Sequence, residues 1–182
     1  MTTSKWVVDP THSEIRFKVK HLMITSVTGQ FNSFGASFET DGDDLTTARV
    51  QFSADIHSIS TNNEQRDAHL RGGDFFDAEN HPRVLFESSR LEKTGEEHYK
   101  MHGVLTMRGT SRPVVLDVEF GGRTVDPWGN ARMGFSVSGI INRNDYGVSF
   151  GMVSETGGIL LGEDVKILAD VQFIRQEVLQ EA

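Results

Sequence analysis

Cysteine is absent from this 182-residue sequence, and proline (four residues) and tryptophan (two residues) are scarce. Without cysteine there is no disulfide, no thiolate nucleophile and no thiolate-bound metal. No apolar run approaches the ~20 residues of a membrane-spanning helix, and the first residues, MTTSKWVVDPTHS, lack the apolar core of a signal peptide. We therefore expect a cytoplasmic protein without stable membrane insertion. The alternative is a periplasmic protein whose signal peptide has been removed.

Positive charge is also in short supply. The 18 lysines and arginines are outnumbered by 26 aspartates and glutamates, which gives a net charge of −8. Such a chain repels nucleic-acid phosphates and anionic membrane surfaces, so we predict no nucleic-acid partner and no electrostatic docking to a membrane. No linker, repeat or low-complexity tract divides the chain. We predict one domain over residues 1–182, ordered from about residue 5 to about residue 175.

Motifs for catalysis and for phosphate binding are missing. The segment GFSVS at 134–138 lacks the second glycine of a nucleophile elbow and lies inside an alternating segment, not at a strand-to-helix turn. Neither GxGxxG nor GxxxxGKS/T occurs, and the seven histidines show no HExxH pair or clustered ligand spacing. We therefore predict no catalytic residue, no metal site and no cofactor, and hence no enzyme.

Most of the chain alternates apolar and polar residues with the period of two that marks half-buried strands. The segments are 6–20, 27–38, 49–59, 99–107, 114–120, 131–141 and 165–173, with a further strand after Pro82. Short polar turns between them favour an antiparallel meander, and a meander of this length avoids exposed edges most simply by closing into a barrel. We therefore predict an all-β fold: a single extended antiparallel eight-stranded barrel, with a short helix and long loops at one end.

The apolar side of these segments faces the interior of such a barrel. We predict that its wall is formed by Phe17, Phe31, Phe52, Ile56, Phe86, Met101, Leu105, Phe135, Val137, Ile141 and Ile167. Small residues on the same side, at positions 54, 103, 131, 139 and 169, can leave space. An eight-stranded barrel is near the size at which the interior either fills with side chains or holds one small ligand. The pattern alone leaves both options open.

The segment Thr61 to His81, TNNEQRDAHLRGGDFFDAENH, interrupts the alternation. Thr61 with Glu64 three residues later is a capping box, which predicts a short helix over about residues 62–70. The adjacent rings of Phe75 and Phe76 stand in a polar loop and need a place to be buried. They form either a hydrophobic plug at one end of the barrel or a lid or wall over an apolar ligand, and the two roles are compatible.

Three cationic side chains are candidates for contacts with the polar headgroup of a lipid. Arg66 and His69 share a face of the predicted helix because they lie one turn apart. Arg143 belongs to a second polar cluster, NRNDYG, directly after a strand. The alternative for the helical pair is a structural network that holds the helix to Asp74 or Asp77. The alternative for Arg143 is a turn with an Arg–Asp pair.

These motifs, in this order, resemble the YceI-like, polyisoprenoid-binding proteins over nearly the whole chain. RDxHL followed by DFFD is the most specific part of the resemblance. The matching residues are Asp9-x-x-His12-Ser13-x-Ile15-x-Phe17-x-Val19-x-His21, Val27-x-Gly29-x-Phe31, Ser58-Ile59-x-Thr61, Arg66-Asp67-x-His69-Leu70, Asp74-Phe75-Phe76-Asp77, Pro82-x-x-x-Phe86-x-Ser88, Gly103-x-Leu105-Thr106-x-x-Gly109, Gly134-Phe135 and Arg143-x-Asp145-Tyr146-Gly147.

The resemblance implies an extended lipocalin-like barrel whose apolar interior holds a polyisoprenoid, an isoprenoid quinone or a similar lipid chain. It implies binding for carriage, storage or sensing, without catalysis, and it suggests a homodimer. The wall residues then contact the tail, Phe75 and Phe76 cap it, and Arg66, His69 and Arg143 contact the headgroup. The alternatives are an enzyme that acts on an isoprenoid-type substrate and a filled structural barrel that acts through its loops.

Overall fold

The computed structural model describes residues 2–148 and 161–176. Within these ranges the chain forms eleven β-strands, one α-helix and three short 3-10 helices. In chain order they are β1 (Thr3–Val8), η1 (Pro10–His12), β2 (Glu14–His21), β3 (Thr25–Phe31), β4 (Phe34–Asp41), β5 (Asp44–Asp55), η2 (Ile56–Ser58), β6 (Ile59–Ser60), α1 (Glu64–Arg71), β7 (Arg83–Lys93), β8 (His98–Met107), β9 (Thr110–Val125), β10 (Ala131–Asn142), η3 (Arg143–Tyr146) and β11 (Leu161–Gln176).

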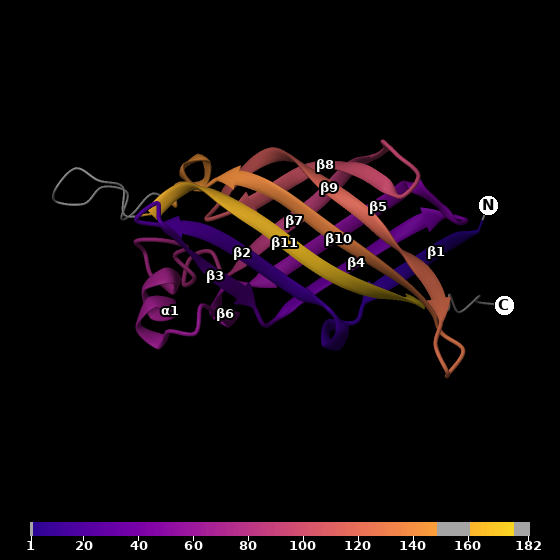
Figure 1. Cartoon of the computed structure of the whole chain (residues 1–182), viewed down its shortest axis with the longest axis horizontal. Helices are drawn as coiled ribbons and strands as arrows, with labels where there is room; N and C mark the ends of the chain where they lie inside the picture. The colour runs from indigo at the N-terminus through magenta and orange to yellow at the C-terminus, as the bar shows by residue number, and fades with distance from the viewer. Residues whose placement is uncertain (1, 149–160, 177–182) are drawn as a thin grey trace.

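Eight of the strands close into a barrel, which Figure 1 shows. Neighbours pair in the order β1, β4, β5, β7, β8, β9, β10, β11, and β11 pairs back to β1. All of these pairings are antiparallel. A closed ring leaves no free edge along its length, which is the physical reason for closure. The predicted all-β antiparallel barrel of eight strands is confirmed.

Three neighbouring strands of the wall are interrupted at one level of the barrel. The first interrupted strand consists of two pieces, β1 and β2, which both pair with β11. Val8 at the end of β1 lies opposite Phe173, and Glu14 at the start of β2 lies opposite Asp170. Between them η1 leaves the sheet. Residues 32–33 separate β3 from β4, and η2 separates β5 from β6. Beyond the interruption the wall continues as β2, β3 and β6, and β6 ends the sheet.

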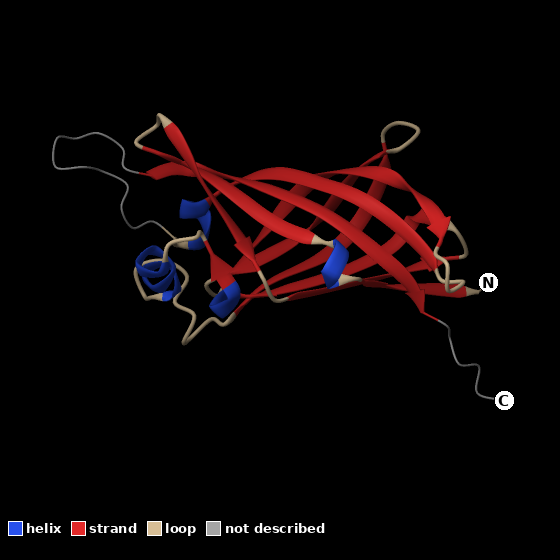
Figure 2. Cartoon of the chain, turned by 60° about the horizontal axis from the view of Figure 1, so that its bottom comes forward, coloured by secondary structure: helices blue, strands red, loops and turns tan. Residues whose placement is uncertain are grey.

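The helix α1 and the loop that follows it lie at the end of the barrel where β6 ends the sheet (Figure 2). The predicted short helix is present, but the predicted capping box of Thr61 and Glu64 is wrong. Asn62 has a positive φ of 61°, so the helix begins after it, and the side chain of Asn63 caps it by accepting from Arg66 N at 3.0 Å. Thr61 instead donates its N–H and its hydroxyl to Asp67 Oδ1, at 2.8 and 2.6 Å. Asp67, not Glu64, is therefore the carboxylate that closes this turn.

The opposite end of the barrel, where β1 begins and β11 ends in Figure 1, is filled by an aromatic cluster that we call the aromatic base. It contains Trp6, Phe38, Phe120, Phe135 and Phe173. The ring of Phe38 lies 4.8 Å from that of Phe173 and 5.8 Å from that of Phe135, and it stacks on Trp6 at 5.9 Å. These are favourable separations for aromatic pairs. With Trp6 only 1% exposed, this end of the barrel is a packed core.

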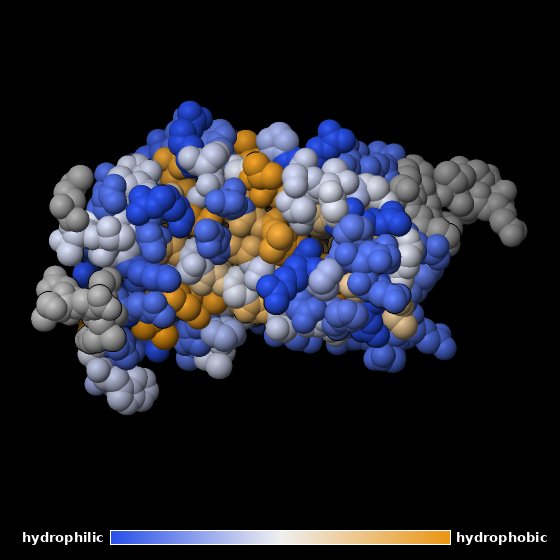
Figure 3. Space-filling model, turned by 180° about the vertical axis from the view of Figure 1, so that it is seen from behind, coloured by the Kyte–Doolittle hydropathy of each residue, from blue (hydrophilic) through white to orange (hydrophobic). Residues whose placement is uncertain are grey.

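The outer surface of the barrel is polar with apolar side chains interspersed, as the face shown in Figure 3 illustrates. Leu85 on β7, Val104 on β8 and Val115 on β9 are 45%, 43% and 49% exposed. Two hairpin tips expose large apolar side chains further. Trp128, between β9 and β10, is 80% exposed, and Ile24, between β2 and β3, is 78% exposed. These two tips belong to opposite ends of the barrel (Figure 1).

Candidate ligand cavity

The barrel is hollow between the aromatic base and α1. Its cavity has a volume of about 240 Å³, and its lining comes from the strands of the ring other than β1, from β2 and β3, and from the segment around α1. Of the lining side chains in the described part of the chain, only Arg16 and Arg143 are polar. Several inward residues, among them Phe52 and Val137, are only half-buried although they point inside. They are half-buried because they face open space in place of a packed neighbour.

The structure places twelve of the thirteen predicted apolar site residues on this cavity. They are Phe17, Phe31, Phe52, Phe75, Phe76, Phe86, Met101, Leu105, Phe135, Val137, Ile141 and Ile167. Ile56 is not among the lining residues. It is 1% exposed, but it begins η2, where the strand alternation has ended and Asp55 caps the turn. Whether the twelve contact a ligand stays a prediction.

The small inward residues do not open the cavity in the way that the sequence suggests. A β-carbon at Gly103 would lie 2.5 Å from both the carbonyl oxygen of Glu87 and Cζ of Phe86. A β-carbon at Gly139 would lie 2.5 Å from Cδ2 of Leu116. Neighbouring side chains therefore already occupy the room that these glycines leave. Of the five small positions, only Ala169 lines the cavity.

Phe75 and Phe76 close the cavity at the α1 end. Both rings line it. Phe76 meets Phe31 of β3 edge-on at 6.4 Å, and Phe75 is 6% exposed. The loop after α1 thus serves as a wall of the cavity and as the plug of one end, which combines the two roles expected for this pair. We call residues 72–81, which carry both rings, the plug loop.

Arg66 and His69 are exposed on α1 and do not line the cavity. Arg66 donates from Nε to the hydroxyl of Thr61 and from Nη2 to its carbonyl, both at 2.7 Å. His69 Nε2 lies 2.9 Å from Asp74 Oδ2, and its ring packs edge-on against Phe75 at 5.0 Å. Arg66 thus ties α1 to the residue Thr61 that precedes it, whereas His69 ties α1 to Asp74 of the plug loop, as the structural alternative expects for His69. A headgroup role for Arg66 and His69 stays a prediction.

Arg143 is buried and lies on the cavity, at the end of β10. Its guanidinium donates to the carbonyls of Gly162 at 2.9 Å, Val148 at 2.8 Å and Leu161 at 3.4 Å. Burial lowers its pKa, and the charge of Glu163 opposes that shift. For Arg143 the structure shows contacts to backbone carbonyls in place of the Arg–Asp pair given as the alternative, and a headgroup role stays a prediction. The side chain of Asn142 caps η3.

Arg108, in the turn between β8 and β9, was missed by sequence reasoning. Its Nη1 donates to the carbonyl of Gly147 after η3 at 2.5 Å, and its Nη2 donates to the carbonyl of Gly73 in the plug loop at 2.8 Å. One side chain therefore ties the plug loop to the barrel rim. The one sequence signal that could have pointed to Arg108 is its place in the motif Gly103-x-Leu105-Thr106-x-x-Gly109, directly before Gly109.

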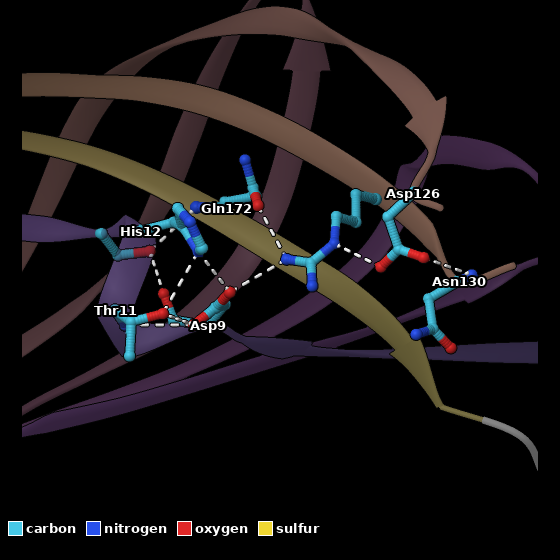
Figure 4. A network of polar contacts seen from close by, with 8 residues as sticks. Asp9, Thr11, His12, Asp126, Asn130 and Gln172 are labelled. Carbon is cyan, nitrogen blue, oxygen red and sulfur yellow. Dashed lines mark hydrogen bonds and ion pairs between the residues drawn. The ribbon is translucent and has the colours of Figure 1, made fainter. Parts of the chain in front are cut away.

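A second polar cluster lies away from the cavity, where η1 leaves the sheet (Figure 4). Arg132 on β10 donates from Nη1 to Asp9 Oδ2 at 2.9 Å and to Gln172 Oε1 at 2.8 Å. Its Nε donates to Asp126 Oδ2 at 2.8 Å. The side chains of Arg132, Asp9 and Asp126 are only 16%, 11% and 7% exposed. This network joins Asp9, in the connection between β1 and β2, to Arg132 on β10 and Gln172 on β11.

The pKa values of both carboxyl groups in the network are depressed. The hydrogen bond from Arg132 is the main reason that the pKa of Asp126 falls to about 2. The pKa of Asp9 falls well below its usual range because it accepts hydrogen bonds from Thr11, His12 and Arg132. Both groups are therefore charged near neutral pH, and the network is a structural ion-pair cluster.

Two further searches concern the described residues only. No group of three or more histidine, aspartate or glutamate side chains there is arranged to hold a metal ion. No helix in that part of the chain is long and apolar enough to cross a membrane.

The fold and the cavity define the class: a hollow lipocalin-like barrel with an apolar interior. A model of the YceI-like domain matches residues 6–173. A UPF0312 protein of Staphylococcus epidermidis is 38% identical over 171 residues, which cover 93% of this chain and 97% of that protein. A UPF0312 protein of Staphylococcus aureus is 36% identical with the same coverage. The chain therefore belongs to the YceI-like family, as the sequence motifs predicted.

Solved structures agree with this assignment. A Campylobacter jejuni YceI protein is 33% identical with a TM-score of 0.77, over 87% of this chain and 90% of that one. BcnA of Burkholderia cenocepacia has a TM-score of 0.80 at 23% identity, over 91% and 98% of the two chains. A polyisoprenoid binding domain from Saccharophagus degradans has a TM-score of 0.69 at 15% identity, over 94% and 98%. The last two likenesses concern the fold alone.

Proposed function

We propose that this protein binds one long apolar lipid chain, such as a polyisoprenoid or the tail of an isoprenoid quinone, inside its barrel. The observation that carries the proposal is the cavity, whose lining in the described chain is apolar except for Arg16 and Arg143. An enclosed apolar cavity is a binding site for an apolar ligand by default. The name of the polyisoprenoid binding domain from Saccharophagus degradans, which shares this fold, supports the same class of ligand.

Affinity for such a ligand comes from its tail. Each buried methylene contributes ~0.8 kcal/mol, so ten buried methylene-sized groups contribute roughly 8 kcal/mol before the cost of ordering the chain. A tail that runs along the cavity is held by contact area along its whole length. This favours ligands selected by their hydrocarbon part, with Arg66, His69 and Arg143 proposed as secondary contacts for a headgroup.

We propose carriage, storage or sensing of the lipid in the cytoplasm, without catalysis and without a cofactor. An enzyme needs polar groups that face the reacting atoms. In the described lining, Arg143 already donates to three backbone carbonyls, and Arg16 lies 3.1 Å from Asp170. This supports binding over turnover. Loss of turnover with retained binding in an Arg143→Gln variant would favour the enzyme instead.

The test is mass spectrometry of an organic extract of the purified protein, beside native mass spectrometry of the intact complex. We expect one long-chain isoprenoid or quinone per chain. Protein that purifies empty and also refuses a C55 polyprenol or ubiquinone offered in excess contradicts the proposal. It would favour a structural barrel that acts through its loops.

We also propose a homodimer. Leu85, Val104 and Val115, exposed on the adjacent strands β7, β8 and β9, supply apolar surface for a second copy. Sedimentation velocity of the wild-type protein and of a Leu85→Glu/Val104→Glu variant tests this directly. A monomer at every concentration of wild-type protein contradicts it.

A further inference from the structure

The turn between β2 and β3 exposes three consecutive large apolar side chains. Leu22, Met23 and Ile24 are 45%, 55% and 78% exposed. The turn is tight, because the N–H of Ile24 donates to the carbonyl of His21 at 3.1 Å. Leu22 and Met23 at its centre have φ values of 51° and 59°. Such hairpin turns strongly prefer Asn-Gly or Asp-Gly, and large side chains are disfavoured there. The fold gives no reason for this choice of residues.

This tip lies at the α1 end of the barrel, the end away from the aromatic base (Figures 1 and 2). The two strands that carry it also line the cavity, through Phe17 and Val19 on β2 and Phe31 on β3. Phe31 packs against Phe76 of the plug loop. The exposed tip is thus joined directly to the part of the cavity wall that the plug loop closes.

Three lysines stand behind the tip on the outer face of the sheet. Lys18 and Lys20 of β2 and Lys166 of β11 are exposed, and Lys166 lies directly opposite Lys18. Like charges directly opposite each other in a sheet are destabilising. None of the three has an ion pair within the described residues. Glu163 and Asp164 of β11 are the nearest exposed carboxyl groups along that strand.

The spacing of these groups matches a bilayer surface. At ~3.3 Å per residue, Lys20 lies roughly 7 Å and Lys18 roughly 13 Å behind Leu22 along the strand. Apolar faces of peripheral proteins reach ~5–10 Å into the headgroup boundary. An inserted tip therefore brings the lysines to the level of the headgroups, where each basic residue is attracted by anionic lipid.

We propose that Leu22, Met23 and Ile24 dock the barrel reversibly on an anionic lipid bilayer, with the α1 end facing the membrane. This apolar tip would serve the exchange of bound lipid with the membrane, and in this respect the inference rests on the proposed function. Docking on an anionic bilayer also revises the expectation, drawn from net charge, that the protein does not dock on membranes. The net charge of −8 belongs to the whole chain and does not describe the face that meets the lipid. The apolar cargo then passes between bilayer and cavity without crossing water.

Flotation of the full-length protein with vesicles of phosphatidylethanolamine and phosphatidylglycerol tests this. The variant is Leu22→Asn/Met23→Gly/Ile24→Thr, which removes the apolar tip and gives the turn residues that it prefers, so that folding is preserved. The matched control is Val125→Thr/Trp128→Ser, which removes exposed apolar side chains from the opposite end. We expect at least about a tenfold loss of vesicle binding for the first variant and less than about twofold for the control.

A Lys18→Gln/Lys20→Gln/Lys166→Gln variant separates the electrostatic part. It is expected to weaken binding to anionic vesicles and to leave the weaker binding to phosphatidylcholine vesicles unchanged. Full vesicle binding by the tip variant, or loss in the Trp128 control alone, overturns the proposal. Wild-type protein that carries lipid but does not float with vesicles overturns docking and leaves the proposed function intact. Protein that floats but carries no lipid contradicts the proposed function alone.

Discussion

The ring of Phe17 on β2 lies directly over Gly29, its cross-strand partner on β3. A β-carbon at Gly29 would lie 2.2 Å from Cζ of Phe17 and 2.6 Å from its Cε1. The missing side chain at 29 is thus the space in which the Phe17 ring sits. The ring also meets Phe31 at 5.7 Å and faces the cavity.

Gly29→Ala is therefore expected to destabilise the barrel by about 1–3 kcal/mol, as overpacking of a filled site does. Phe17 lines the cavity, so displacement of its ring into that space should lower the lipid content as well. Gly35→Ala on β4 is the matched control, because in the described part of the chain its β-carbon would meet nothing closer than Ser53 Oγ at 3.9 Å. Urea unfolding of both variants measures the difference. Equal stability of the two contradicts the packing.

Phe135→Asp is expected to strip the lipid and to lower stability by several kcal/mol, because it places an unpaired carboxylate among the rings of Phe38, Phe120 and Phe173. Ile140→Asp on the same strand is the control. Ile140 is 67% exposed and lies opposite Lys166, so a carboxylate there stays in water. Native mass spectrometry reports the lipid, and circular dichroism reports the fold. A folded Phe135→Asp protein with full lipid content argues against an interior site.

Arg108→Gln is expected to speed the release of lipid by about tenfold, since it removes charged hydrogen bonds to the carbonyls of Gly73 and Gly147. Transfer of a fluorescent polyprenol from the protein to acceptor vesicles measures the rate. Arg90→Gln serves as the control, because Arg90 is exposed and its partners among the described residues are the nearby side chains of Glu92 and His102. An unchanged transfer rate for Arg108→Gln shows that the plug loop does not limit exchange.

The network around Arg132 predicts how stability depends on pH. The pKa of Asp126 falls from its ordinary value near 4 to about 2, and that of Asp9 falls further. Carboxyl groups with a depressed pKa add stability above their ordinary pKa and lose it as the pH falls through the folded-state value. Wild-type stability should therefore fall steadily below pH ~4. Arg132→Met should be less stable at pH 7 and should show a flatter decline on acidification.

Unfolding in urea at a series of pH values measures this dependence. Arg16→Met is the comparison, since Arg16 pairs with the more exposed Glu14 and Asp170. It should change stability by less than about 1 kcal/mol, as exposed ion pairs do. Parallel pH curves for Arg132→Met and the wild type would show that the network does not contribute in this way.

The sequence pattern predicts the parts of this molecule that depend on local periodicity. Alternation identifies the strands, and from Phe17 to Ile167 it also selects the side of each strand that faces the cavity. It fails at Ile56, because η2 breaks the period of two at that residue. It fails for Gly103 and Gly139 as well, because a glycine in a strand says nothing about which neighbouring side chain covers it.

Contacts between distant segments could not be predicted. Arg108 and Gly147 are 39 residues apart, and Arg132 and Asp9 are 123 apart. Which arginine reaches which carbonyl or carboxylate depends on the register in which strands far apart in the sequence pair around the barrel. Neither composition nor motif spacing specifies that pairing. The same holds for Thr61, whose choice of Asp67 over Glu64 follows from the turn at Asn62.

The aromatic base closes one end of the cavity, so the depth of the cavity limits the length of the hydrocarbon chain that it can hold. A hydrocarbon chain that enters beneath the plug loop can advance only until it meets Phe38, Phe135 and Phe173. Chains shorter than that depth leave apolar wall uncovered, and longer ones leave carbon in water. The barrel should therefore select ligands by chain length. Replacing Phe38 or Phe173 with a smaller residue would deepen the cavity and should shift the preferred chain length upward.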